Sequence, residues 1–452
     1  MSSNPAVEVT LPLSEFAAGL QWSSVPAQVR HEAVRSLMNF FAVSMAGCND
    51  PTIARAAGVL GRYSARDEAT LIGRGERADL LTASALNAMS ANVFDFDDTH
   101  IPTIIHPTAP VAPALFALAE TRAMSGAELL HAFVLGVEIE CRIGNAVSPG
   151  HYARGWHITS TCGVFGAAAA AGRILGLDAK RIAWAFGSAA SQSCGLVETL
   201  GTMAKSMAVG NSARNGLLSA LLAAEDFDGP AQPLEGVRGF LHVTAEKPDL
   251  AGLVAGLGES WQLMRNTYKP YPCGVVLNPV IEACLSLHAK PELKVGEITA
   301  VELVGHPLLR QRTDRPGIST GRQSQVSAQH AVGVVLTTGR AGLEQFSDAA
   351  VADEKVRAIG RKLSFTDDER MSIDAASVIV SQGARKLEVA IDFAAGSLEK
   401  PLSDAALETK LRDLCAYGRS GVDPAPLIDA VWALEQSKDA GSLLRLAAGI
   451  RQ

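Results

Sequence analysis

Apolar residues recur at helical spacing through most of the first half of the chain. The clearest stripe consists of Val29, Ala33, Leu37, Phe40 and Phe41. These residues lie three or four positions apart, as on one face of a helix. Pro26 precedes the stripe and Pro51 follows it, which are typical helix start and stop signals. The same kind of pattern predicts helix after helix over about residues 12–249.

An Ala-rich stretch, residues 163–175, predicts a helix that packs closely against its neighbours. Leu175-Gly176-Leu177-Asp178 is expected to end this helix and to cap the next one. The apolar side of that next helix consists of Ile182, Phe186, Ala189 and Ala190. Small side chains let helices approach one another closely, so the pattern indicates a helical bundle.

The pattern changes after Asn266. A short apolar run at 298–304 is typical of a strand, and residues 376–380 and 387–393 predict two more, joined by a turn at Gln382-Gly383. A helix is expected over 324–338, and Ser403 is expected to cap the last helical region. We therefore predict a mainly α protein. Residues 1–267 and 396–452 form a large all-helical domain from both termini, and residues 268–395 form a smaller α+β domain.

Composition excludes several classes of function. The net charge is −7, without runs of like charge, so a nucleic-acid partner is not expected. Residues 1–15 do not resemble a signal peptide, and no apolar stretch reaches the roughly 20 residues that span a bilayer. We expect a cytoplasmic protein without a membrane partner. The seven cysteines never form a CxxC pair, which favours reduced thiols over a zinc site.

The densest polar segment is 92–108. It holds Asp95, Asp97, Asp98, His100 and His106 between Ala-rich helices, which favours a functional site over core packing. One alternative is a helix end where the carboxylates accept backbone hydrogen bonds. Another is a magnesium site at Asp97-Asp98, but that would need a second acidic segment nearby, and 367–369 falls in the other predicted domain. No metal is therefore expected.

A second polar segment, 151–157, directly precedes the Ala-rich helix. A helix N-terminus carries unpaired N–H groups and partial positive charge, so it favours a bound anion. Tyr152, Arg154 and His157 could add hydrogen-bond donors. A packed histidine is the alternative, and it weighs more for His151 than for His157.

Two lysines complete the candidate chemistry. Lys205 lies among small and apolar residues at 201–211. Burying its charged side chain there is unfavourable unless the ammonium group contacts an anion. The alternative is that the side chain extends to solvent. Lys269 precedes Pro270 and Pro272 at the predicted domain junction, where ligand sites are common. No nucleotide-binding fingerprint is present, so no organic cofactor is expected.

As an ordered set, these motifs resemble the MmgE/PrpD family. Its members include 2-methylcitrate dehydratase, cis-aconitate decarboxylase and iminodisuccinate epimerase, which act on small polycarboxylates. The resemblance implies a helical domain, an α+β lid, a homodimer and a metal-independent site in the cleft between domains. That site would be lined by Asp95, Thr99, His106, His157, Lys205 and Lys269.

The chain departs from its relatives at two positions. His330 stands in Ser327-Ala328-Gln329-His330 where the decarboxylase and dehydratase branches have Tyr, and Asn278 stands where many relatives have His. An imidazole in place of a phenol changes the reference pKa of a proton donor from about 10 to about 6.5.

The shared difficulty of these reactions is carbanion character next to a carboxylate. We expect His106 and His157 to transfer protons, Lys205 and Lys269 to stabilise charge, and Asp95 to orient a histidine. Tyr152 or His330 would supply a second proton. The remaining predicted contacts of the substrate are Thr99, Arg154, Cys273 and Asn278, although a buried thiol is the favoured interpretation of Cys273.

The sequence ranks four functions. A cofactor-free lyase resembling 2-methylcitrate dehydratase comes first, by family frequency. An epimerase of an iminodisuccinate-like substrate follows, then a cis-aconitate-type decarboxylase, and last a non-catalytic polycarboxylate-binding protein.

Overall fold

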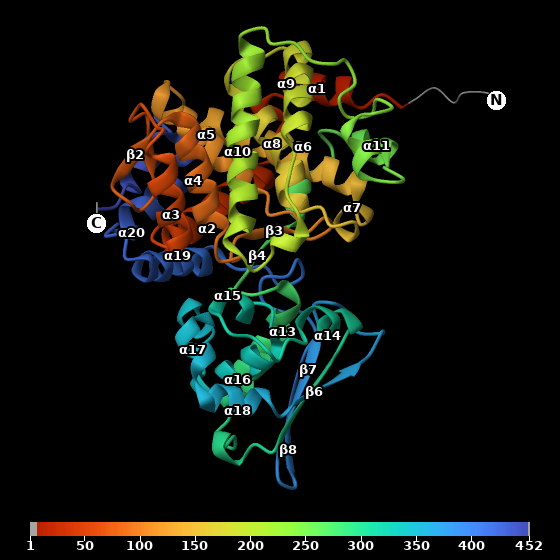
Figure 1. The fold of residues 1–452 in the computed structure, drawn as a ribbon, viewed down its shortest axis with the longest axis vertical. Helices are drawn as coiled ribbons and strands as arrows, with labels where there is room; N and C mark the ends of the chain where they lie inside the picture. Colours follow the sequence, from red (N-terminus) through yellow and green to blue (C-terminus); the bar gives the residue numbers. More distant parts are fainter. Residues whose placement is uncertain (1–6, 451–452) are drawn as a thin grey trace, which may run out of the picture. The chain divides into compact units, whose positions relative to one another are not determined.

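The computed structural model describes residues 7–450. The chain divides into two compact units. We call the first the helical unit; it comprises Met1–Val93, Asp97–Asn266 and Asp404–Gln452. We call the second the mixed unit; it comprises Phe94–Phe96 and Thr267–Ser403. Helices predominate, which confirms the predicted mainly α class (Figure 1). Within residues 7–450, every helix is too short or too polar to cross a membrane.

The helical unit is built from helices that contribute mostly small and aliphatic side chains to one core. Its helices from the first part of the chain are α1 (Thr10–Gly19), η1 (Trp22–Ser24), α2 (Ala27–Gly47), α3 (Pro51–Leu60), α4 (Leu80–Asn92), α5 (Thr108–Thr121), α6 (Gly126–Val147), α7 (Gly150–Ala153), α8 (Ile158–Ile174), α9 (Ala179–Gln192), η2 (Val197–Thr199), α10 (Met203–Ala224), α11 (Phe240–Thr244), α12 (Leu250–Val254) and η3 (Gln262–Arg265). Those from the C-terminal part are α19 (Asp404–Gly418), α20 (Pro424–Trp432), η7 (Leu434–Gln436) and α21 (Ser442–Leu446).

Local sequence signals explain where several of these helices begin. The predicted apolar stripe lies on α2 and is buried along its whole length. Asp178 caps α9, as predicted, by accepting the backbone N–H of Arg181 at 2.8 Å. Ser125 and Glu128 form a reciprocal capping box at the start of α6.

Helices α8 and α10 form the closest pairing in this unit, and Figure 1 shows them side by side. A Cβ atom added at Gly216 of α10 would lie 2.5 Å from the Cβ of Ala167 and 2.6 Å from the Val164 carbonyl oxygen on α8. Only a residue without a side chain lets the two backbones approach so closely. Small residues, from which the sequence predicted close helix packing, therefore allow α8 and α10 to approach each other.

The predicted succession of helices over 12–249 is interrupted by short strands in two places. Strands β1 (Ala69–Leu71) and β2 (Glu76–Ala78) form an antiparallel pair, and β3 (Asp98–His100) follows α4. Three-residue strands are too short to show the alternation that identifies a strand in a sequence. β3 matters most, because it carries part of the polar segment.

The mixed unit packs helices against a four-stranded sheet. Its elements are β4 (Asn266–Tyr268), η4 (Val275–Leu277), α13 (Asn278–His288), η5 (Val295–Glu297), β5 (Ala300–Gly305), α14 (Pro307–Thr313), α15 (Gly321–Ser324), α16 (Ala328–Thr338), η6 (Leu343–Phe346), α17 (Asp348–Ala352), α18 (Glu354–Gly360), β6 (Leu363–Asp367), β7 (Ala376–Gln382) and β8 (Arg385–Ile391). Asn266, the first residue of β4, still belongs to the helical unit.

The sheet has the strand order β6-β5-β7-β8. β5 runs parallel to β6, whereas β7 is antiparallel to both β5 and β8. The predicted turn between β7 and β8 is present, with Gly383 at φ +59°. Helices α13 and α16 pack in the apolar core of this unit, and α13 contacts β7 and β8. The predicted helix over 324–338 is divided into α15 and α16.

Candidate active site

His106 lies just beyond β3, and its ring is held from one side. Its Nδ1 lies 2.6 Å from the main-chain oxygen of Asp98. Thr99 Oγ1 and Asp97 Oδ1 each lie 3.4 Å from the same nitrogen. A carbonyl oxygen can only accept a hydrogen bond, so Nδ1 carries the hydrogen and the lone pair of the neutral ring is on Nε2. Nε2 is therefore the nitrogen that can take up and give back a proton.

The backbone of His106 joins this histidine to α8. Its N–H donates to Thr159 Oγ1 at 3.1 Å, in the first turn of that helix. His106 thus lies beside the N-terminal end of α8, although more than fifty residues separate it from this helix in the sequence.

Asp97 and Asp98 of the polar segment are buried and hydrogen-bonded. Asn92 donates to Asp97 Oδ2 at 2.7 Å. Asp98 Oδ2 accepts from Thr108 Oγ1 and, at 2.7 Å, from Asn266 Nδ2. Burial raises the pKa of Asp98 to about 7, and the neighbouring charge of Asp97 adds to the increase. These oxygens therefore fix the segment through side-chain donors, whereas the helix-end alternative had assumed backbone N–H donors.

His157 occupies the N-cap position of α8, as the sequence predicted from the Ala-rich run that follows it. Its Nδ1 lies 3.1 Å from Ser160 Oγ, and that hydroxyl donates to the main-chain oxygen of His157 at 3.0 Å. Because the hydroxyl hydrogen is already used, Nδ1 is the donor and Nε2 carries the lone pair. The residue is buried, and its backbone N–H donates to the Gly195 carbonyl at 3.1 Å.

Lys205 lies in the first turn of α10 and is buried, with 7% of its surface exposed. A Cβ atom added at Gly195 would lie 2.0 Å from Ser160 Oγ on α8 and 3.3 Å from the Ala208 Cβ on α10. Together with the packing at Gly216, this shows that α8 and α10 run in the same direction. Their N-terminal ends, with His157 and Lys205, therefore lie together, and His106 borders the same end.

This end of the helical unit is suited to anions. Two helix N-termini contribute partial positive charge and unpaired N–H groups, and Lys205 contributes a full charge. Histidines that can exchange a proton through Nε2 stand beside them. The arrangement can bind a carboxylate and transfer a proton.

The mixed unit contains the second predicted lysine. Lys269 Nζ donates to Asp95 Oδ2 at 2.8 Å and to the main-chain oxygen of Asp95 at 2.7 Å. Asp95 has a positive φ of 52°, which turns its carbonyl and its carboxylate toward the same lysine. The sequence prediction gave Asp95 the task of orienting a histidine, whereas its carboxylate here pairs with Lys269. Asp97, which the prediction did not assign, is the aspartate within the helical unit that lies beside His106.

Three further predicted residues of the mixed unit make contacts within it. Cys273 Sγ donates to Asn278 Oδ1 at 3.8 Å, and burial raises the pKa of Cys273 to about 12, which fits the buried-thiol alternative. The Nε2 of His330 lies 2.7 Å from the Gln345 carbonyl, to which it must donate. Burial lowers the pKa of His330, so its ring stays neutral at pH 7.

The 151–157 segment lies on and after α7. Tyr152 is half-buried on this helix, whereas Arg154 is exposed and lies 3.7 Å from Glu246. His151 is fully buried, with its Nε2 2.7 Å from Thr161 Oγ1, in agreement with the packed-histidine alternative. His157 is thus the N-cap of α8, and His151 packs against Thr161 in the first turn of the same helix.

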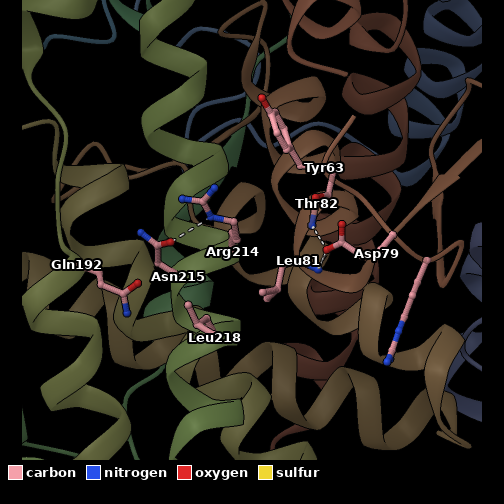
Figure 2. A pocket seen from close by; sticks show the side chains of 10 residues that line it. Tyr63, Asp79, Leu81, Thr82, Gln192, Arg214, Asn215 and Leu218 are labelled. Carbon is pink, nitrogen blue, oxygen red and sulfur yellow. Dashed lines mark hydrogen bonds between the residues drawn. The ribbon is translucent and has the colours of Figure 1, made fainter. Parts of the chain in front are cut away.

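A cavity of about 570 Å³ opens elsewhere in the helical unit (Figure 2). Its lining consists of Tyr63, Ala65, Arg66, Asp79, Leu81, Thr82, Gln192, Arg214, Asn215 and Leu218. Asp79 caps α4 there, and Arg214 Nε donates to Asn215 Oδ1 at 3.2 Å. None of the residues predicted from the sequence to act on substrate lines this cavity.

Comparison with known proteins places these features in a family. The MmgE/PrpD N-terminal domain matches residues 12–252, and the MmgE/PrpD C-terminal domain matches residues 271–435. A cis-aconitate decarboxylase-like protein of Aspergillus oryzae is 26% identical over 480 residues, covering 99% of this chain and 98% of its own length. The cis-aconitate decarboxylase of Aspergillus terreus is 26% identical, with 98% and 96% covered. The human cis-aconitate decarboxylase is also 26% identical, with 95% and 92% covered. The two domain matches span most of the chain, which therefore belongs to the MmgE/PrpD family.

Proposed function

We propose that this protein is a lyase that decarboxylates cis-aconitate or a closely similar polycarboxylate. The observation that carries the proposal is the match, over nearly the full length of both chains, to cis-aconitate decarboxylases. These relatives support the decarboxylase, which the sequence analysis ranked third, over the 2-methylcitrate dehydratase that it ranked first.

The structure of the substrate determines which chemical groups the protein must provide. cis-Aconitate carries three carboxylates around one carbon–carbon double bond. When the carboxylate on the methylene carbon leaves as CO₂, the electron pair of the broken bond is conjugated with the double bond. A proton must then bond to carbon. Decarboxylation therefore needs cations that hold the remaining carboxylates and one acid, but no base that removes a proton.

The N-terminal end of α8 and α10 supplies groups of these kinds. Lys205 and the two helix N-termini would hold a carboxylate. His106 in its imidazolium form would donate its Nε2 proton to carbon, and it would return to the neutral ring with hydrogen on Nδ1. The Asp97 carboxylate, 3.4 Å from Nδ1, favours the imidazolium that precedes this step. His157, also with Nε2 as its exchangeable nitrogen, is the second candidate donor.

Several contributions remain predictions of the family resemblance. Lys269 is proposed to stabilise charge, and Asp95 to orient a histidine. A homodimer is proposed on the same ground, and the cytoplasmic location expected from the sequence stays a proposal.

The proposal is tested with purified protein and three substrates: cis-aconitate, 2-methylcitrate and iminodisuccinate. We expect CO₂ release from cis-aconitate alone, and we expect Lys205→Ala to lower kcat/KM by at least about 100-fold. Dehydration of 2-methylcitrate, or epimerisation of iminodisuccinate without CO₂ release, would replace the proposal by one of the other family reactions.

A further inference from the structure

Asp98 contacts His106 through its main chain. Its carbonyl oxygen, at 2.6 Å, is the nearest of the three oxygens around Nδ1, since those of Asp97 and Thr99 are 3.4 Å away. The position of this one carbonyl therefore decides how firmly the hydrogen is kept on Nδ1.

The side chain of the same residue is anchored on two sides. Its Oδ2 accepts from Thr108, at the start of α5, and from Asn266, which is far away in the sequence. Asp98 has no exposed surface. A buried carboxylate without donors is strongly unfavourable, so these hydrogen bonds define one position for the side chain. The carbonyl belongs to the same residue, so a fixed side chain also restrains its position.

We propose that Asp98 is a positioning residue whose anchored carboxylate fixes the carbonyl that keeps His106 in the Nδ1–H tautomer. This role rests on the proposed function, in which His106 transfers a proton through Nε2. Asp98 itself does not touch the substrate. It acts by making Nε2 the nitrogen that gains and loses the proton.

The competing explanation is that Asp98 only stabilises the fold. Both explanations predict a loss of stability when the carboxylate is removed. They differ in the folded protein, because a purely structural residue would leave the tautomer of His106 and the kcat of the folded fraction unchanged.

The decisive variants remove or keep the accepting oxygen. Thr108 and Asn266 both donate to Oδ2, so Asp98→Ala removes both hydrogen bonds. Asp98→Asn is the matched control, because its amide oxygen can take the place of Oδ2 and accept from both donors, with its NH₂ group at the position of Oδ1.

Two measurements read out the effect. The first is the tautomer of His106 in ligand-free protein with ¹⁵N-labelled histidine, observed through long-range ¹H–¹⁵N couplings and assigned with His106→Gln. The second is kcat and KM for cis-aconitate. For Asp98→Ala we expect Nε2–H signals to appear, kcat to fall about 100-fold and KM to change less than about threefold. Asp98→Asn is expected to keep the Nδ1–H tautomer and a kcat within about tenfold of wild type.

An Asp98→Ala protein that keeps both the Nδ1–H tautomer and the wild-type kcat would overturn the proposal. So would a folded Asp98→Asn protein that keeps its stability and loses the Nδ1–H tautomer. If Asp98→Ala does not fold, Thr108→Val removes one anchor and keeps the carboxylate; an unchanged tautomer there counts against the proposal. A wild-type protein that does not act on cis-aconitate refutes the proposed function, while the tautomer comparison still decides the role of Asp98.

Discussion

Replacing Glu140 with glutamine is expected to stabilise the protein, and increasingly so as the pH rises. Glu140 lies on α6 with no exposed surface, and neither carboxyl oxygen has a hydrogen-bond partner among residues 7–450. It faces glycines of α8: a Cβ added at Gly166 would lie 2.4 Å from its Oε2. Burial raises the pKa of Glu140 well above 4.5, and the charge of Asp98 raises it further. The folded protein therefore keeps the Glu140 proton at pH values where the unfolded chain has lost it.

The size of the effect follows from the linkage between proton binding and folding. Above pH 4.5 the unfolded chain releases the Glu140 proton, whereas the folded protein retains it up to its raised pKa. The free energy of unfolding therefore decreases by about 1.4 kcal/mol for each pH unit in this range. Glu140→Gln has no such proton, so its stability relative to wild type should rise by about the same amount for each pH unit.

Urea unfolding followed by far-UV circular dichroism at pH 5, 6 and 7 measures this difference. Glu235→Gln is the matched control. Glu235 is also buried, but its carboxylate accepts the backbone N–H groups of Val9 and Thr10 at 3.1 to 3.2 Å, so an amide there should destabilise the protein. If the advantage of Glu140→Gln stayed constant from pH 5 to pH 7, the neutral, unpartnered state of Glu140 would be refuted.

Three further predictions concern packing, a buried charge and the site. Gly216→Ala should lower the free energy of unfolding by about 1 to 3 kcal/mol, because α8 and α10 must separate. Gly58→Ala is the control, since a Cβ atom added at this exposed position of α3 has no neighbouring atom within 4 Å. It should raise the free energy of unfolding by about 0.5 to 1 kcal/mol. Both are read from urea midpoints, and equal effects would contradict the packing argument. Arg142→Met should lower the free energy of unfolding by about 3 to 5 kcal/mol in the same assay. Its buried guanidinium pairs with Glu138 and donates to four main-chain oxygens. A decrease of less than about 1 kcal/mol would contradict this explanation. Turnover should persist in EDTA, whereas loss in EDTA and recovery with Mg²⁺ would revive the metal alternative at Asp97-Asp98.

The sequence predicted most helices because their signals are local. The stripe on α2 and the cap at Asp178 each lie within a few residues of the feature that they define. His157 was placed at a helix start for the same reason. Strands β1 and β2 were missed because three residues carry too little periodicity.

The inner arrangement of the site could not be predicted in the same way. The contact between His106 and Asp98 is made by a main-chain oxygen, and every residue type has one, so the sequence does not indicate this contact. The anchor from Asn266 joins positions 168 residues apart. His330 drew attention because it departs from the family pattern, yet its ring is bonded to the Gln345 carbonyl. Contacts of this kind depend on how distant segments of the chain come together in the folded protein, which cannot be derived from a single sequence.

Proton NMR of cis-aconitate incubated with the wild-type protein in D₂O tests the central claim most directly. The account predicts loss of CO₂ with one deuterium bonded to carbon per turnover, because the acid that completes the reaction exchanges with solvent. It also predicts that Lys205→Ala leaves the substrate unchanged. Intact cis-aconitate after incubation with folded wild-type protein would contradict the account.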